Sequence, residues 1–210
     1  MNRGLFMTVE GTDGSGKTTQ IRLMESYIRA KGYEVVLTRE PGGTNISEKI
    51  RSIILDHDNA EMGKIAEMLL YASARAQLVS EVIKPAIESG KIVICDRFID
   101  SSYVYQGFGR GISLELIRGI NKAAMDGIEP DITFFLDLSP EVALNRRIAS
   151  TGADRIEKEK MEFHMRVYSG YKKLVSMYPG RIKPINSSRK IEDIFGDVKS
   201  WIDWLLNKKG

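Results

Sequence analysis

The sequence predicts an α/β domain organised around a parallel β-sheet. Short runs rich in β-branched residues recur between longer segments of helical periodicity, and this alternation is typical of a sheet whose strands are joined by helices. A glycine-rich loop lies between the first such run and the first helical segment, as in strand–loop–helix units that bind phosphate. The predicted strands are 5–9, 34–37, 92–95, 132–136 and 182–185.

Apolar residues at helical spacing predict the helices that follow these strands. Gly32 stands where a C-terminal cap would end the first helix, and the third helical segment is expected to run to about Gly90 with a kink at Pro85. Residues 139–141, Ser-Pro-Glu, have the N-cap, first-turn proline and early acid of a helix start. The predicted apolar faces are Ile21, Met24, Tyr27 and Ile28; Ile46, Ile50, Ile53 and Ile54; Ile65, Met68, Leu69 and Ala72; and Ile191, Ile194, Phe195, Val198 and Ile202.

The chain shows no internal division. We find no repeat, no low-complexity tract and no linker, so we predict one domain over residues 1–210. Residues 150–160, S-T-G-A-D-R-I-E-K-E-K, break the helical pattern with small residues and clustered charge. That composition is typical of an exposed, mobile loop, and we expect this segment to be a lid.

Composition and charge narrow the classes of protein to which the chain can belong. Its 210 residues, 42% of them hydrophobic, suffice for one sizeable core. There are 31 Lys and Arg and 28 Asp and Glu, so the net charge of +3 is far from the concentrated charge of a nucleic-acid-binding protein. The single cysteine, Cys95, cannot form an internal disulfide, and no apolar run has the length of a signal peptide or membrane span. We therefore expect a cytoplasmic protein with no nucleic-acid or membrane partner.

The glycine-rich loop, G-T-D-G-S-G-K-T at residues 11–18, matches the phosphate-binding pattern G-x-x-x-x-G-K-[ST] between a predicted strand and a predicted helix. Backbone N–H groups and the helix N-terminus would hold phosphate oxygens, Lys17 would reach the β and γ phosphates, and Thr18 would bind Mg²⁺. A purely structural glycine turn would leave Lys17 and Thr18 unexplained. The predicted ATP-binding residues are Gly11, Thr12, Asp13, Gly14, Ser15, Gly16, Lys17, Thr18 and Thr19.

This loop alone does not separate kinases from GTPases. A GTPase needs N-K-x-D to recognise guanine, and the nearest string, residues 121–126, is two residues too long and lies in a predicted helix. No D-x-x-G switch follows a strand at a plausible position either. The sequence therefore favours a kinase that uses ATP and Mg²⁺.

Further motifs follow the predicted strands, at the sheet edge where open α/β folds bind ligands. They are T-R-E-P-G-G-T at 38–44, D-R-F at 96–98 and, between and after these, Y-A-S-A-R at 71–75 and Y-Q-G-F-G-R-G at 105–111. Together with the loop, they closely resemble the thymidylate kinases, which convert dTMP to dTDP, over the chain from about Phe6 to the last helix. The resemblance implies a P-loop NTPase-type five-stranded parallel sheet surrounded by helices, a short mobile lid and a homodimer.

The resemblance also implies roles for individual residues. Asp13 would accept a hydrogen bond from the sugar 3′-hydroxyl of dTMP. Arg39 and Arg97 would bind the acceptor phosphate, as suits the guanidinium fork. Tyr71 would stack on thymine, and Arg75 would reach a carbonyl of the base.

Other implied contacts surround these. Ser101 and Gln106 would lie by the base, and Tyr105 would press on the 2′ position of the sugar. Pro41 would line the same pocket, and Asp96 would act through Mg²⁺ or its waters.

Members of the family carry a catalytic arginine either in the P-loop or in the lid. The P-loop of this sequence has none, so the lid would supply Arg155, or Arg147 at its leading edge, while Ser150 stands where some relatives have an arginine. Arg146 is a candidate for stacking on adenine. The implied catalytic residues are Lys17, Arg97, Arg155 and Arg147.

Structural interpretations compete with several of these roles. Tyr71 shares a helical stripe with core residues, Arg39 and Arg75 could be surface arginines, and Asp96 and Arg97 could form a structural ion pair. Two alternative functions also stay open: a kinase for another pyrimidine monophosphate, and a P-loop protein that uses nucleotide as a switch.

Overall fold

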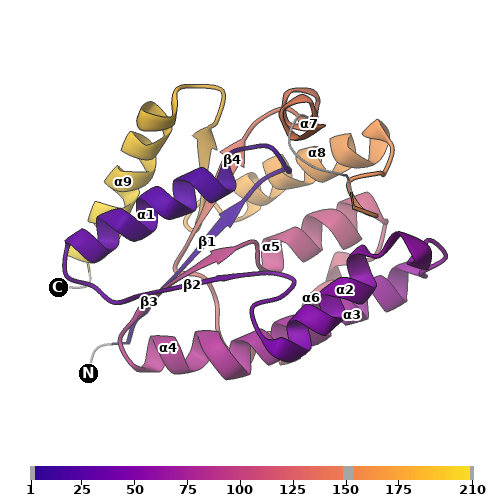
Figure 1. Ribbon diagram of the computed structural model, residues 1–210, viewed down its shortest axis with the longest axis horizontal. Helices are drawn as coiled ribbons and strands as arrows, with labels where there is room; N and C mark the ends of the chain where they lie inside the picture. Colours follow the sequence, from indigo (N-terminus) through magenta and orange to yellow (C-terminus); the bar gives the residue numbers. More distant parts are fainter. Residues whose placement is uncertain (1–2, 149–153, 209–210) are drawn as a thin grey trace.

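The computed structural model describes residues 3–148 and 154–208, with the side chains of residues 147 and 148 outside the description. Within these ranges the five predicted strands form one parallel sheet in the order β2-β3-β1-β4-β5 (Figure 1). The α/β fold class is therefore confirmed. The strands are β1 (Leu5–Glu10), β2 (Val35–Arg39), β3 (Ile92–Asp96), β4 (Ile132–Asp137) and β5 (Ile182–Asn186).

Each strand continues one or two residues beyond its predicted carboxyl end. The added last residues are all polar, so the apolar pattern stops while the backbone pairing goes on. They are Glu10, Arg39, Asp96, Asp137 and Asn186. In the parallel register Asp96 of β3 lies beside both Val9 of β1 and Arg39 of β2, which brings these polar ends to one edge of the sheet.

Helices cover both faces of the sheet (Figure 1). The cores on the two faces are separate: one joins α1 and α9 to the sheet, and the other joins α3, α4 and α8. The helices are α1 (Lys17–Ala30), α2 (Asn45–Leu55), α3 (Lys64–Leu78), α4 (Lys84–Glu88), α5 (Ile99–Ser102), α6 (Leu114–Met125), α7 (Pro140–Ile148), α8 (Met161–Met177) and α9 (Ile191–Asn207). None of the helices in the described ranges combines the length and apolar character needed to span a membrane.

The expected irregularity near Pro85 takes the form of a π-helical turn, η2 (Val79–Ile83), between α3 and α4. Proline has no N–H, and its ring would clash with the preceding turn of a regular α-helix. Here the backbone widens before Pro85, so that Lys84 N–H donates to Val79 O. A second π-helical segment, η3 (Tyr103–Gly109), continues α5.

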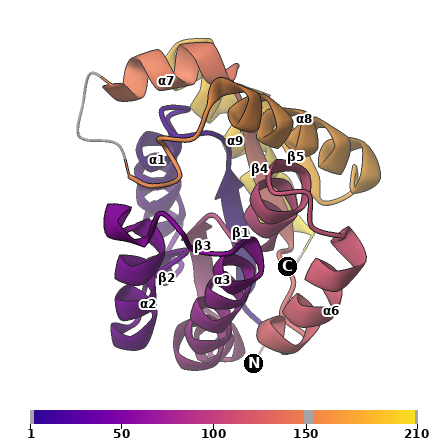
Figure 2. The ribbon, with the colours of Figure 1, turned by 90° about the vertical axis from the view of Figure 1, so that its right-hand side faces the viewer.

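Helical periodicity predicted the buried face of α3 only in part, since Met68 and Ala72 are buried, and it predicted little of the buried face of α2. Ile46 and Ile53 on α2, and Ile65 and Leu69 on α3, are each more than 40% exposed. Of the predicted face of α2, only Ile54 is buried. These two helices pack against each other (Figure 2), so their exposed apolar side chains belong to neighbouring elements.

Segment η3 packs tightly against α8. An added Cβ at Gly109 would lie 2.6 Å from the ring of Phe163, and one at Gly170 would lie 2.6 Å from the ring of Phe108. The close approach of the two elements therefore requires glycine at both positions. It fixes η3, which lies next to the ends of β1 and β3.

We expect Gly170→Ala to lower the free energy of unfolding by about 1–3 kcal/mol, because Phe108 is contacted near its own Cβ and has no room to move. Chemical denaturation measures this. The matched control is Gly196→Ala within α9, where no atom lies within 4 Å of the added Cβ. The control should gain about 0.4–1 kcal/mol. Equal effects of the two substitutions would show that the contact between η3 and α8 is loose.

Candidate active site

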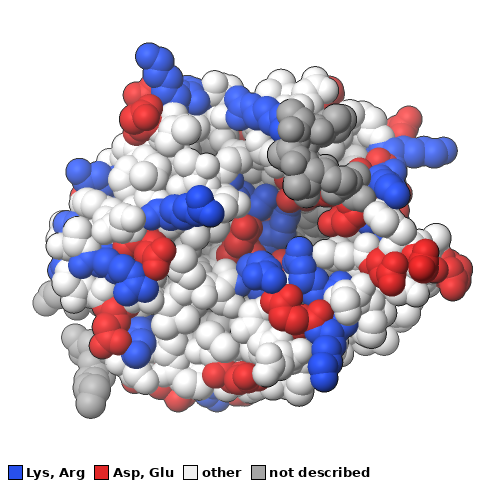
Figure 3. All heavy atoms as spheres, in the orientation of Figure 1, with Lys and Arg blue, Asp and Glu red and all other residues white. Residues whose placement is uncertain are grey.

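A cavity of about 540 Å³ opens at the carboxyl ends of the central strands. Figure 3 shows it as a hollow near the middle of this face, with acidic and basic side chains gathered around it. Its lining comes from the P-loop, the segment after β2, α2, α3, the segment after β3, α7 and the chain after residue 153. The lining residues are Asp13, Gly14, Gly16, Lys17, Thr18, Thr19, Glu40, Pro41, Arg51, Leu55, Tyr71, Arg75, Asp96, Arg97, Ser101, Tyr105, Gln106, Arg146, Asp154, Ile156 and Glu157.

The P-loop connects β1 to α1 and closes one end of this cavity. Gly14 and Gly16 have φ angles of 87° and 94°, in the left-handed region that glycine adopts without strain. An added Cβ at Gly14 would lie 2.0 Å from the carbonyl oxygen of Ala143, so α7 packs directly on the loop. Because α1 begins at Lys17, its first N–H groups and its positive dipole end point into the loop, which suits an anion.

Lys17 is buried and its ammonium group lies inside the loop that precedes it. The Nζ atom donates to the carbonyl oxygens of Gly11 and Thr12, at 3.1 Å each, and lies 3.4 Å from Asp13 Oδ1. A cation is thus held at the place where the pattern predicts phosphate. The remaining loop residues Gly11, Thr12 and Ser15 do not line the cavity.

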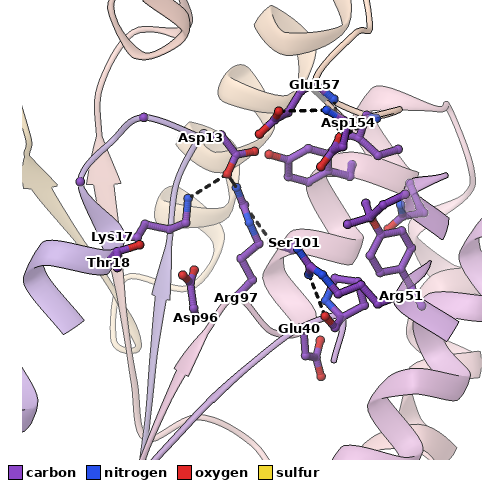
Figure 4. A pocket seen from close by; sticks show the side chains of 18 of the residues that line it. Asp13, Lys17, Thr18, Glu40, Arg51, Asp96, Arg97, Ser101, Asp154 and Glu157 are labelled. Atoms are coloured by element: carbon purple, nitrogen blue, oxygen red, sulfur yellow. Dashed lines mark hydrogen bonds and ion pairs between the residues drawn. The ribbon is translucent and has the colours of Figure 1, made fainter. Parts of the chain in front are cut away.

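Asp13 lies between two cations, as Figure 4 shows. Its Oδ1 accepts from Arg97 Nη2 at 2.8 Å as well as facing Lys17. Burial opposes ionisation of the Asp13 carboxyl, but Arg97 and Lys17 outweigh it and hold the pKa of Asp13 well below its usual range. The carboxylate therefore stays charged at neutral pH and joins the P-loop to the segment after β3.

Arg97 has a left-handed backbone, with φ of 69°, which is strained for a residue other than glycine. The strain aims its guanidinium into the cavity, where it lies 5.3 Å from the ring centroid of Tyr105. Its Nη1 also donates to Ser101 Oγ at 3.4 Å and to Tyr171 OH at 3.3 Å. Three elements therefore fix the direction of one arginine.

Glu10, the last residue of β1, accepts hydrogen bonds from residues around Arg97. It is fully buried and accepts from the N–H of Phe98 at 2.8 Å and from the hydroxyls of Ser101 and Tyr171 at 2.7 Å each. The two hydroxyls are the ones to which Arg97 donates. Burial, and then the charge of Asp100, raise the pKa of Glu10. The sequence interpretation missed Glu10, although an acid at the end of an apolar strand was a signal for it.

Tyr71, Tyr105 and Gln106 also line the cavity. Burial raises the pKa of both tyrosines above the usual value, so both rings carry intact hydroxyls at neutral pH. Tyr105 and Gln106 come from η3, and π-helical turns often mark functional positions because they redirect side chains. The structure therefore brings these three predicted residues together.

Arg75 also lines the cavity, but its N–H groups already have acceptors. Nε and Nη2 donate to Glu40 at 2.9 Å and 2.5 Å, Nη1 donates to Ser102 Oγ and to Asn121 Oδ1, and Nη2 also donates to Phe98 O. All five donors of the guanidinium are thus used within the protein. The expectation that Arg75 donates to a base carbonyl is not supported by this arrangement, because no donor is left over.

Two other predicted arginines lie outside the cavity lining. Arg39, at the end of the edge strand β2, is half exposed and pairs with Glu48 at 2.8 Å. Arg155 turns away from the P-loop: its Nη2 lies 2.7 Å from Glu67 Oε2, and its Nε donates to Ile54 O. The side chain of Arg147, and residues 150–153 of the predicted lid with Ser150, lie outside the described residues.

Arg51 supplies positive charge that the sequence interpretation did not assign. It lines the cavity from α2 and donates to Pro41 O at 2.8 Å. Helical spacing was the available signal, because Arg51 and Leu55 are four residues apart and both line the cavity. Asp154 and Glu157 are further lining residues that were missed.

The chemistry of the site suits Mg²⁺ held together with phosphates. Asp96 and Thr18, the two predicted ligands, both line the cavity, and Asp96 Oδ1 is buried with no hydrogen-bond partner among the described residues. In those residues no group of three or more His, Cys, Asp or Glu could hold a metal alone. Mg²⁺ needs no such group, since it is usually bound through one or two side chains, substrate phosphates and water.

The loop after β5 lies against the P-loop. Ser187 Oγ donates to Ser15 O at 2.5 Å, and Arg146 Nη1 lies 3.5 Å from Ser187 O. Arg146 lines the cavity at this end. Arg146 is therefore placed beside the P-loop.

Comparison with known proteins is consistent with this geometry. The family model described as thymidylate kinase matches residues 9–198. A thymidylate kinase of Clostridium novyi is 47% identical over 205 residues, covering 96% of this chain and 100% of that protein, and one of an Exiguobacterium species is 49% identical over 207 residues, covering 99% and 98%. A crystal structure of thymidylate kinase from Ehrlichia chaffeensis superposes with a TM-score of 0.78 at 35% identity, covering 96% of this chain and 99% of that one.

Proposed function

The chain belongs to the thymidylate kinase family, and from this we propose that it transfers the γ-phosphoryl group of ATP to dTMP, giving ADP and dTDP. The observation that carries the proposal is one cavity that is lined both by Lys17 and other P-loop residues and by Tyr71, Tyr105 and Gln106. Within this cavity Asp13 of the P-loop pairs with Arg97 of the segment after β3. A donor polyphosphate and an acceptor monophosphate can therefore meet in one enclosure.

In this mechanism the P-loop binds the β and γ phosphates of ATP, with Lys17 as the buried cation. Thr18 and Asp96 would hold Mg²⁺, which would supply positive charge beside the phosphates. Arg97, and Arg51 in place of Arg39, are our candidates for holding the acceptor phosphate, because both line the cavity. No strong base is needed, because that phosphate is already anionic and catalysis rests on positioning and charge stabilisation.

The nucleoside of dTMP would lie among the aromatic side chains. Tyr71 offers a face for the base, and Tyr105 lies over Arg97 where the sugar would join its phosphate. Asp13 remains our candidate for the 3′-hydroxyl. Arg155 is engaged by Glu67, so of the two lid arginines Arg147 becomes the stronger candidate for the transferring phosphoryl group.

A coupled assay for ADP formation tests this function, with ATP and a panel of dTMP, dUMP, UMP, CMP and AMP. We expect dTMP to be the preferred acceptor. Preference for another pyrimidine monophosphate would favour the alternative kinase. A slow ATPase that dTMP does not stimulate would favour a nucleotide switch, and either result would contradict the proposal.

We also propose a homodimer in the cytoplasm. Exposed Ile46 and Ile53 on α2, with Ile65 and Leu69 on α3, support the dimer because four large apolar side chains on packed helices are costly to leave in water. A buried, unpaired Cys95 is compatible with a reducing compartment. Sedimentation at micromolar concentration tests the dimer, and a monomer would contradict it.

Tyr105→Ala should raise kcat/KM for ribothymidine monophosphate relative to dTMP by about tenfold or more, because an aromatic ring against C2′ rejects an added hydroxyl. The ratio is the readout, since loss of the Arg97 contact will lower both values. Tyr103→Phe is the control: Tyr103 is buried in the core and does not line the cavity. An unchanged ratio in a folded Tyr105→Ala protein would refute the role.

A further inference from the structure

Glu67, on the first turn of α3, is a buried carboxylate that collects donors from three segments. It is 1% exposed. Its Oε1 accepts from Gln106 Nε2 at 3.1 Å and from Arg110 Nε at 3.2 Å. Its Oε2 accepts from Arg110 Nη2 at 3.1 Å and from Arg155 Nη2 at 2.7 Å. One carboxylate thus joins α3 to η3, to the residue that follows η3 and to Arg155 of the predicted lid.

The contacts of Glu67 determine its protonation state. Burial acts to raise the pKa of Glu67, but Arg110, Gln106 and Arg155 outweigh it, so that the pKa is lowered. Glu67 is therefore ionised at neutral pH. An ionised carboxylate can only accept hydrogen bonds.

This restriction determines which end of the Gln106 amide faces Glu67. Only the NH₂ end of an amide donates, so Gln106 must turn Nε2 toward Glu67 Oε1, which is the arrangement in the structure. The amide oxygen then points elsewhere. Gln106 lines the cavity beside Tyr105, and among the described residues none is seen to donate to its amide oxygen. Gln106 therefore offers the cavity an acceptor.

We propose that Glu67 is a specificity-determining residue, which fixes the Gln106 amide so that the site accepts bases with an N–H donor on the recognised edge and rejects those without one. Thymine and uracil carry N3–H, whereas cytosine has a bare N3 acceptor that would meet the Gln106 oxygen with no proton between them. A buried polar group left without a partner is costly, and sites of this kind discriminate strongly. The inference rests on the proposed function and deepens it, since it concerns which pyrimidine the same cavity takes.

The two oxygens of Glu67 separate this role from a second one. Arg110 donates to both oxygens, but Arg155 of the predicted lid donates only to Oε2 and Gln106 only to Oε1. A change at Arg155 therefore alters the lid without turning the amide. A change that makes the Oε1 position a donor must turn the amide.

Glu67→Gln is the decisive substitution. The new side chain is expected to keep its oxygen on the two arginine Nη2 atoms, so that among the arginine donors only Arg110 Nε loses its acceptor. Its NH₂ group then stands where Oε1 was, and Gln106 must turn its oxygen toward that group and its own NH₂ group into the cavity. We expect the ratio of kcat/KM for dTMP to that for dCMP to fall at least tenfold, with inhibition constants used for any acceptor that is not turned over. The ratio of dTMP to dUMP should stay within twofold, because both bases carry N3–H.

Three controls accompany it. Arg155→Ala should change the rates with dTMP and dCMP together and leave their ratio within twofold. Glu67→Asp, which can still only accept, should keep the ratio even if kcat falls. In a Gln106→Leu background, Glu67→Gln should have no further effect on the ratio, since its effect passes through that amide.

The outcomes distinguish this inference from the function on which it rests. A wild-type protein that does not phosphorylate dTMP overturns the function, whereas an active wild type with an unchanged ratio in folded Glu67→Gln overturns the role of Glu67 alone. If that variant does not fold, nuclear magnetic resonance of the wild type decides. The Gln106 NH₂ protons should stay protected from exchange and keep their shifts when dTMP binds, and a base contact from NH₂ would overturn the inference.

Discussion

Lys17→Ala is expected to lower kcat for dTMP phosphorylation by about 10³-fold, which is the scale reported for removal of a preorganised charge that meets the transition state. The reason lies in how the P-loop is built. Its other phosphate donors are backbone N–H groups, so Lys17 is the one cation that the loop itself contributes. Its Nζ is held by the carbonyl oxygens of Gly11 and Thr12 and lies beside Asp13, already at the phosphate position before ATP arrives.

The coupled ADP assay measures this loss, and ATP binding and thermal melting are followed in parallel. Lys31→Ala provides a matched control, because Lys31 follows α1 directly and is exposed, where it pairs with Asp203 at 3.0 Å. We expect the control to retain wild-type kcat. A Lys17→Ala protein that keeps more than a tenth of wild-type kcat would refute the assignment of the phosphate site.

The strands illustrate how far sequence pattern reaches. Each strand was predicted from its apolar run, and each prediction stopped short of a polar final residue such as Glu10, Asp96 or Asp137. Apolar pattern reports burial, whereas a strand is defined by backbone pairing, which continues to the edge of the sheet. The residues left out were therefore the ones nearest the site.

The site residues divide in a similar way. Positions inside the P-loop motif could be predicted, because the motif specifies a local backbone geometry. The sequence could not show whether Arg39 or Arg51 lies in the site, since that depends on the orientation of an edge strand and of a helix. In the structure only Arg51 lines the cavity, and Arg39 pairs with Glu48. The pairing of Arg75 with Glu40 joins residues 35 apart, and that of Arg155 with Glu67 joins residues 88 apart. Contacts over such separations have no local signal.

The exposed faces of α2 and α3 show a third limit. Periodicity identified both as helices, and the apolar face of each helix was expected to meet the core of the same chain. Ile46 and Leu69 instead meet solvent in the single chain. An apolar face that meets solvent and one that meets the core produce the same sequence pattern, so only the structure separates them.

Arg97 provides the last prediction, which concerns activity and stability together. Its side chain bonds to Asp13 and donates to Ser101 and Tyr171 while lying over Tyr105. Neither Arg97→Ala nor Arg97→Gly can make these contacts, and we expect both to lower kcat/KM for dTMP by about 10³-fold. The coupled assay measures that loss.

The two variants should differ in stability, because the backbone at this position has φ of 69°. A left-handed conformation costs roughly 1 kcal/mol or more for a residue with a Cβ and almost nothing for glycine. Both variants lose the same ion pair with Asp13, so that loss cancels when they are compared. In chemical denaturation the free energy of unfolding of Arg97→Gly should therefore be about 1 kcal/mol higher than that of Arg97→Ala. Equal stabilities would mean that the turn relaxes once the arginine is gone, and that Glu10, which binds the N–H of Phe98, does not hold it in place.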